Sequence, residues 1–175
     1  MEKPSIAKGP ETAFMSAYEE YGDAVFRFCV MKVSDRDIAR DITQETFTRA
    51  WDYCVQGNTI EQWKAFLFRT AYNLIVDTYR KKRSVSLDAM IDERDFAIPD
   101  EDDVRSINRA EAKRVRAEIQ NLDETYRDVL ILRYTEDLPP REIARIMGLT
   151  ENVVSVRLHR GMKELRERMG PQKNI

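Results

Sequence analysis

The chain has 175 residues, of which 42% are hydrophobic and 34% charged, and its formal net charge is −2. This composition is typical of one folded domain or two small ones, and it excludes a protein held on nucleic acid by net charge alone. Apolar runs are too short to predict a membrane span, and we expect no signal peptide and no membrane insertion, so the sequence predicts a cytoplasmic protein.

The first two predicted elements are amphipathic helices. Apolar residues repeat at helical spacing over residues 11–32, with Phe14 and Phe28 near the two ends of the stripe. Residues 34–37 (Ser-Asp-Arg-Asp) then predict that this helix ends and that a second, N-capped helix begins. The second helix runs to about Cys54, and Ile42 and Trp51 lie on its apolar side.

A turn at residues 56–59 precedes a third predicted helix. Thr59 and Gln62 have the spacing of a capping box, which predicts that this helix begins directly after Thr59. Phe68 and Tyr72 fall outside its main apolar stripe, beside Arg69 and Asn73. Mixtures of aromatic and basic residues bind single-stranded nucleic acid, although such rings on a helix are more often part of a core than of a binding site.

An acidic, aperiodic segment separates this half of the chain from a second helical half. Helical spacing returns at residue 106, and Asp123 is predicted to cap a helix that ends near Tyr134. No segment has the alternation of a strand. The sequence therefore predicts an all-α protein with two small helical domains, residues 1–86 and 106–170, joined by a flexible acidic linker over 87–105.

Residues 138–169 predict a helix-turn-helix. Pro139 and Pro140 suit the first turn of a short helix, Gly148 suits a tight turn, and Thr150 suits the N-cap of the next helix. Inward positions on these two helices are apolar: Ile143, Ala144, Met147, Val154, Leu158, Met162 and Leu165. The outward face of the second helix is polar and basic, which is typical of a helix that reads DNA, although an αα-hairpin with a solvated basic face gives the same pattern.

Other residue patterns bear on chemistry. Cys29 and Cys54 lie in apolar helical patterns and predict small buried side chains, and His159 has no metal-ligating neighbours in the sequence. We therefore expect no metal and no cofactor. Since the sequence shows no nucleophile–base pair and no phosphate-binding glycine loop, we also expect no enzymatic activity and no small-molecule substrate.

Three segments taken together resemble a known family. These are DITQETFTRAW, WKAFLFRTAYNLIVDTYRKKR and the stretch from LDETYRDVL to KELRERM, and they occur in the family's order from about Tyr18 to Met169. In this respect the chain is similar to the extracytoplasmic-function (ECF, group 4) sigma factors of the sigma-70 family. The resemblance implies a transcription initiation factor made of sigma domains 2 and 4, and it implies core RNA polymerase and promoter DNA as partners.

The resemblance also assigns roles to residues. It implies that a polar ridge binds the β′ clamp coiled coil of polymerase: Asp41, Gln44, Glu45 and Thr48. It implies that the turn and the third helix bind the −10 element and help to melt it: Gln56, Gly57, Asn58, Thr59, Lys64, Arg69, Asn73 and Arg80. It implies that the helix-turn-helix reads the −35 element: Arg141, Asn152, Ser155, Val156, His159, Arg160 and Lys163.

Further partners follow from the resemblance. The family implies contact with the polymerase β flap and control by an anti-sigma factor, and it places the acidic linker in a basic polymerase channel. At Ser155, Val156 and His159 the chain departs from the residues that are common in the family, so no promoter sequence is carried over. Two other functions stay open from the residues alone. One is an autonomous helix-turn-helix regulator with an N-terminal helical interaction domain, and the other is a sigma-mimicking adaptor that binds an inhibitor without reading DNA.

Overall fold

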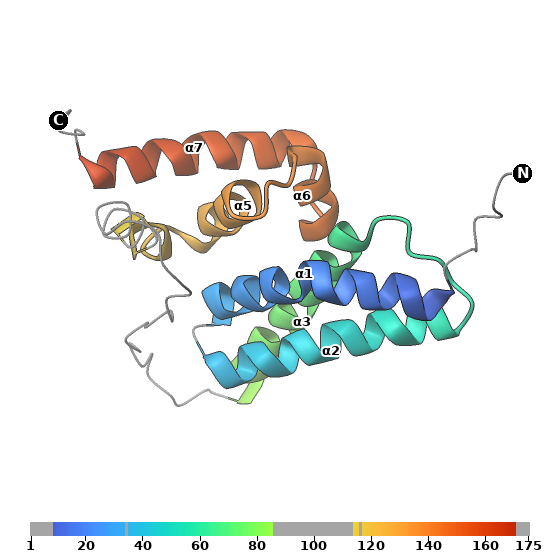
Figure 1. Cartoon of the computed structure of the whole chain (residues 1–175). Coiled ribbons are helices and arrows are strands. Elements are labelled where there is room, and N and C mark those ends of the chain that lie inside the picture. Colours follow the sequence, from blue (N-terminus) through green and yellow to red (C-terminus); the bar gives the residue numbers. More distant parts are fainter. Residues whose placement is uncertain (1–8, 34, 86–113, 116, 171–175) are drawn as a thin grey trace, which may run out of the picture. The chain divides into compact units, whose positions relative to one another are not determined.

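The computed structural model describes residues 9–33, 35–85, 114–115 and 117–170. Every regular element within these residues is an α-helix (Figure 1), which confirms the predicted all-α class. The chain divides into two compact units, Met1–Arg94 and Asp95–Ile175. The predicted linker over 87–105 and the start of the predicted C-terminal domain lie outside the described residues. None of the described helices combines the length and the apolar character that a membrane span needs.

The first unit is built from three helices that pack against one another in pairs (Figure 1). They are α1 (Pro10–Val33), α2 (Arg36–Val55) and α3 (Trp63–Val85). Aromatic rings fill much of the space between them. Phe14 on α1 lies 5.1 Å from Trp51 and 6.2 Å from Phe47, both on α2, and 6.3 Å from Trp63 on α3, measured between ring centroids. One ring of α1 therefore joins all three helices.

The predicted capped start of the second helix is confirmed. Asp35 has an extended backbone, and its Oδ1 accepts hydrogen bonds from the backbone N–H groups of Asp37 at 3.0 Å and Ile38 at 3.1 Å. These bonds satisfy two of the N–H groups that a helix start leaves without intrahelical partners. The short acidic side chain thus fixes where α2 begins.

The predicted capping box at Thr59 and Gln62 is wrong. Helix α3 begins at Trp63, and the backbone N–H of Phe66 donates to the carbonyl of Gln62 at 3.0 Å. The physical reason lies in the residue between the two proposed caps: Ile60 is only 8% exposed. Keeping this segment out of the helix lets the Ile60 side chain enter the core, where burial of an Ile is worth about 1.5–3 kcal/mol.

Phe68, which lies outside the main apolar stripe of the predicted helix, belongs to the core, as is more common for rings on a helix. Its ring is fully buried and lies edge-on to Phe28 at a centroid distance of 5.3 Å. Since α3 packs against both α1 and α2, its buried side is wider than a single apolar stripe. Tyr72, the other ring in that prediction, is partly buried.

The second unit contains the predicted helix-turn-helix. Its helices are α5 (Glu124–Tyr134), α6 (Pro140–Met147) and α7 (Glu151–Met169), and residues 114–115 and 117–120 are also helical. Asp123 caps α5 by accepting from the backbone N–H of Thr125 at 2.9 Å, and Thr150 caps α7 by accepting from the backbone N–H of Val153 at 3.3 Å. Both predicted caps are confirmed.

The turn between α6 and α7 depends on Gly148. This residue has φ of +66°, a conformation that L side chains rarely adopt, and its N–H donates to the carbonyl of Ala144. Pro140 occupies the first turn of α6, where its missing N–H costs nothing. On α6 the core positions are Ile143, Ala144 and Ile146, whereas Met147, which was predicted to face inward, is only partly buried.

Helices α5 and α7 approach each other closely, which the spacing of apolar residues in the sequence does not predict. Gly161 is buried, and a Cβ added to it would lie 2.9 Å from Cβ of Tyr126 and 3.2 Å from Cδ1 of Leu130. The inward stripe of α7 therefore contains Gly161 between Val154 and Leu165. A side chain there would force the two helices apart.

The two cysteines lie in the first unit and are buried, as predicted. Burial raises the pKa of the Cys29 thiol from an ordinary value of 9.0 to about 12, and a hydrogen bond with Thr43 lowers it only in part. Burial also raises the pKa of the Cys54 thiol. Both groups are therefore thiols at neutral pH, which is a poor state for reaction or metal binding.

Candidate protein- and nucleic-acid-binding surfaces

The α2 ridge, which consists of Asp41, Gln44, Glu45 and Thr48, is exposed along its whole length. These positions follow i, i+3, i+4 and i+7 spacing, so they share one side of α2, away from the buried Ile42 and Phe47. The Glu45 carboxylate accepts from Nε of Arg49 at 2.7 Å. Such an exposed ion pair contributes little to stability, so Glu45 can leave Arg49 and pair with a cation of a binding partner. Its geometry suits a protein contact with complementary charge.

The 56–59 loop joins α2 to α3 and is exposed at all four positions. Gly57 has φ of +84°, which turns the chain back on the end of α2. Asn58 is then tied to the carbonyl of Tyr53, which accepts from its backbone N–H at 3.3 Å and from Nδ2 at 3.1 Å. With Ile60 inserted in the core, the loop is held at two points. These two anchors order the conformation of the loop.

The α3 face consists of Arg69, Asn73 and Arg80, which are exposed and lie on one side of the helix. Arg80 forms an ion pair with Asp77 at 3.2 Å, whereas Arg69 forms no ion pair with any residue that the structure describes. The structure does not place Lys64 with this group. Lys64 is partly buried. It precedes Asn73 by nine positions, or about two and a half helical turns, which places the two residues on opposite sides of α3.

A residue pair that the sequence did not single out stands beside the loop. The ring of Tyr53, at the end of α2, lies 5.2 Å from the ring of Phe66 on α3 with an interplanar angle of 42°. Tyr53 is 39% exposed. Phe66 precedes Arg69 by three positions and Asn73 by seven, so it belongs to the same side of α3 as the α3 face. No signal within one helix reveals this pair, because it joins two elements.

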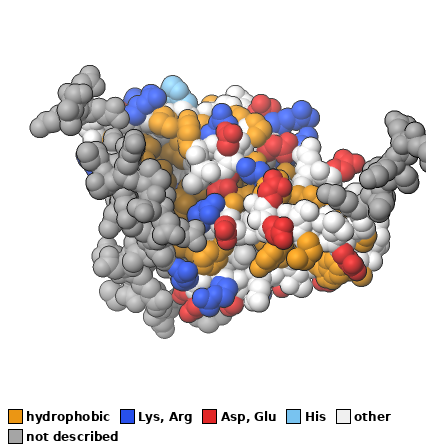
Figure 2. Space-filling view, in the orientation of Figure 1, with side chains coloured by type: hydrophobic (Ala, Val, Ile, Leu, Met, Phe, Trp, Pro, Cys, Tyr) orange, Lys and Arg blue, Asp and Glu red, His pale blue; other side chains and the backbone are white. Residues whose placement is uncertain are grey.

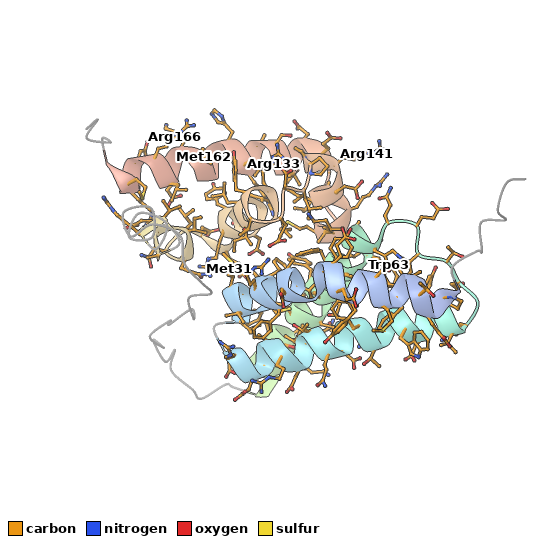
Figure 3. The ribbon with its side chains drawn as sticks, viewed as in Figure 1. Met31, Trp63, Arg133, Arg141, Met162 and Arg166 are labelled. Atoms are coloured by element: carbon orange, nitrogen blue, oxygen red, sulfur yellow. The ribbon has the colours of Figure 1, made fainter. Side chains whose placement is uncertain are left out.

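The recognition face of α7 is exposed as predicted. It consists of Asn152, Ser155, Val156, His159, Arg160 and Lys163. Val156, an apolar residue, is 42% exposed among these polar neighbours. Arg141 lies at the start of α6 and is also exposed (Figure 3). Buried Val154 and Gly161 hold the opposite side of α7 in the core, so this face is presented on a rigid support.

One flank of α7 is hollowed. A cavity of about 400 Å³ opens beside its C-terminal half, and Met162 and Arg166 are marked there in Figure 3. Its lining consists of Tyr134, Leu158, His159, Met162, Lys163, Arg166 and Glu167. Figure 2 shows Lys and Arg side chains beside the histidine and beside hydrophobic side chains over α7. The flank thus combines apolar surface with cations.

Family comparisons match both units. The family model described as Sigma-70 region 2 matches residues 17–85, and the one described as Sigma-70, region 4 matches residues 112–165. The first match covers the α2 ridge, the 56–59 loop and the α3 face. The second covers the helix-turn-helix and the recognition face.

Similar proteins span almost the whole chain. The chain is 29% identical over 176 residues to the ECF RNA polymerase sigma factor SigW of Bacillus subtilis, covering 94% of this chain and 92% of that protein. It is 30% identical over 169 residues to the ECF RNA polymerase sigma factor SigL of Mycobacterium tuberculosis, covering 95% and 94%. Among solved structures, the sigma factor RpoE of Bartonella quintana, in complex with the anti-sigma factor NepR, has a TM-score of 0.74 at 20% identity, covering 92% and 99%.

The two sigma-70 regions follow one another in the chain in the same order as the two compact units. The identity with SigL reaches 30% and extends over 94% of that protein. The structural likeness to RpoE, at 20% identity, shows the shared fold. The chain therefore belongs to the ECF RNA polymerase sigma factors, a family of transcription initiation factors.

Proposed function

We propose that this sigma factor binds core RNA polymerase through the α2 ridge, helps to melt promoters with the 56–59 loop and the α3 face, and reads the upstream element with the recognition face. The observation that carries the proposal is the match of residues 17–85 to sigma-70 region 2. A match to the helix-turn-helix alone would suit an autonomous regulator equally well. A region 2 unit with an exposed acidic ridge favours a polymerase partner.

The α2 ridge is proposed to bind the β′ clamp coiled coil. Asp41 and Glu45 are four positions apart and exposed, so reversing both charges leaves the core of the unit intact. We expect the pair Asp41→Lys and Glu45→Lys to weaken core binding by about 2 kcal/mol or more, as for close charge pairs at interfaces. The measurement is the affinity of purified sigma factor for core polymerase.

Helix α1 offers a matched control for that experiment. Glu19 and Asp23 are also exposed and four positions apart, so Glu19→Lys with Asp23→Lys makes the same charge change elsewhere in the unit. This control should keep the wild-type affinity. Equal affinity of core for the Asp41/Glu45 variant and the control would remove the clamp assignment.

The 56–59 loop is proposed to hold an unstacked base of the −10 element. Extruding a base costs a few kcal/mol, which a binding pocket offsets. Asn58→Ala should leave the closed complex unchanged and reduce promoter opening, and a template with a premelted bubble should restore activity. A defect of equal size on duplex and bubble templates would show that the loop does not act in melting.

Two protein partners complete the proposal. The part of the hollow on α7 that Tyr134, Leu158, Met162 and Arg166 line supports a protein contact, and we assign it to the polymerase β flap. His159 and Lys163, which also line the hollow, stay assigned to DNA. An anti-sigma factor is proposed by analogy with the RpoE complex. Run-off transcription with purified core tests the whole function: an autonomous regulator would bind DNA without core and start no transcripts, and an adaptor would bind no promoter.

A further inference from the structure

The hollow on α7 has an apolar floor and a basic rim. Leu158 and Met162 are partly buried and pack against the core of the second unit, so they form the floor (Figure 3 labels Met162). Arg166 also lines the hollow, is exposed, and forms no ion pair with any residue that the structure describes. Residues 157–168 of α7 include five Lys or Arg residues and two glutamates. An occupant with complementary chemistry therefore combines apolar side chains with carboxylates.

One segment of this chain has that chemistry. Residues 95–103 lie outside the described residues, and their sequence is DFAIPDEDD. It contains five carboxylates, no Lys or Arg, and the apolar side chains of Phe96 and Ile98. DNA could pair with the basic rim but has no apolar side chains for the floor. The segment belongs to the same unit as α7, which begins at Asp95.

The segment is also attached where it can reach the hollow. Nη2 of Arg114 donates to the carbonyl of Met169 at 2.9 Å, so the chain enters the described part of the unit beside the C-terminal end of α7. Leu158 precedes Met169 by eleven positions, or about 17 Å along the helix. The eleven positions from Asp103 to Arg114 can span up to about 36 Å. Because a short tether gives an effective concentration of millimolar order, even a weak contact is occupied.

We propose that residues 95–103 occupy the hollow on α7 when the sigma factor has not bound polymerase. Phe96 and Ile98 cover the floor, and the carboxylates of residues 100–103 pair with the rim at Lys163 and Arg166. The docked segment competes with DNA for the recognition face, and polymerase releases that face because the β flap takes the same hollow. This consequence for DNA rests on the proposed function, whereas the docking itself does not.

A spin label on the segment measures the docking directly. In the full chain, Ala97→Cys takes a nitroxide at neutral pH, while Cys29 and Cys54 are buried thiols with a raised pKa and react poorly. The nitroxide should broaden the amide NMR signals of residues 158–166 and affect those of α6 far less. Raising the salt from 0.1 to 1 M shortens the Debye length from about 10 to about 3 Å, so it should restore most of the broadened signals.

Two charge-matched variants separate docking from general electrostatics. Asp100→Asn with Asp102→Asn removes two carboxylates of the segment and should reduce the broadening. Asp88→Asn with Asp92→Asn makes the same charge change outside the segment and should keep it. The two variants are also compared without polymerase, on a duplex with an upstream element that the holoenzyme selects from a random library. The first should bind this duplex about two- to 30-fold more tightly than the second, the range for loss of two exposed ion pairs.

Three results would overturn the docking. One is the absence of broadening on α7, and another is equal broadening in the two variants. The third is broadening that appears when spin-labelled chains are mixed with isotope-enriched chains that carry no label, which would identify a second copy as the occupant. Different broadening in the two variants with equal DNA affinities would uphold the docking and remove the assignment of the recognition face to DNA, so the two failures are distinguishable.

Discussion

The two units of this sigma factor are stabilised by different kinds of contact. In the first unit, rings from three helices meet: Phe14, Phe28, Phe47, Trp51, Trp63 and Phe68. In the second, aliphatic residues dominate the core, and α5 and α7 approach so closely that only glycine fits at position 161. Large rings also reach the surface of the first unit, where Tyr18 is 52% and Tyr53 39% exposed, and this is compatible with the proposed contact with unpaired bases. Closely packed backbones hold a helix rigidly, which suits the grooves of a duplex.

The largest expected effect tests the ring core. Phe68→Ala removes a fully buried ring that contacts Phe28, and it should lower the free energy of unfolding of the first unit by about 3–5 kcal/mol. Both tryptophans, Trp51 and Trp63, lie in this unit, so the fluorescence transition in denaturant reports on it alone. That transition should move to lower denaturant. An unchanged fluorescence midpoint would contradict the assigned core.

The next effect tests the close approach in the second unit. Gly161→Val places a branched side chain where even a Cβ would lie 2.9 Å from Tyr126, and overpacking of this kind costs roughly 3 kcal/mol. The loss should appear in the helical circular dichroism signal and not in tryptophan fluorescence. If the variant unfolds with the wild-type profile, α5 and α7 are not in close contact.

A third prediction compares residue roles on the recognition face. Ser155 and His159 are proposed to contact base edges, and Arg160 and Lys163 to contact phosphates. Ser155→Ala or His159→Ala should change the preferred upstream sequence, at about 1–3 kcal/mol per base contact. Arg160→Ala or Lys163→Ala should weaken all promoters alike and reduce the salt dependence. Transcription from a randomised upstream library by each variant holoenzyme decides between these roles.

The smallest effect concerns the buried thiol of Cys29. Because burial raises its pKa from an ordinary value of 9.0 to about 12, the unfolded chain ionises first as the pH rises above 9. The thiol therefore costs no stability below pH 9, and the free energy of unfolding should fall by about 1.4 kcal/mol between pH 8 and 10. Other groups titrate in the same range, so the measurement is the difference between wild type and Cys29→Ala. An equal pH dependence of the two would contradict deep burial.

The sequence predicted the features that depend on local chemistry. The capped start of a helix within residues 34–37, the caps Asp123 and Thr150, and the left-handed turn at Gly148 all follow from the effect of a side chain, or of its absence, on the local backbone. The outward positions of α2 and α7 follow from helical periodicity, and their exposure is confirmed. Their roles in binding polymerase and DNA stay predictions.

Contacts between elements account for what the sequence missed. The predicted apolar stripe of α3 does not include the buried Phe68, because a single stripe cannot represent a helix that packs against two neighbours. The capping box at Thr59 failed because burial of Ile60 outweighs a local hydrogen bond. Helical periodicity does not single out Gly161 or Tyr53, because the importance of each depends on a contact with another helix.

The insertion of Ile60 into the core has a thermodynamic consequence for promoter opening. Together with the hydrogen bonds of Asn58, it orders the 56–59 loop when the protein folds. In the proposed melting role, an extruded base would meet a preorganised site, and binding would carry little further entropy cost for the loop. If the proposal holds, the conformation of the loop, as distinct from its chemistry, would determine how readily the holoenzyme isomerises on DNA.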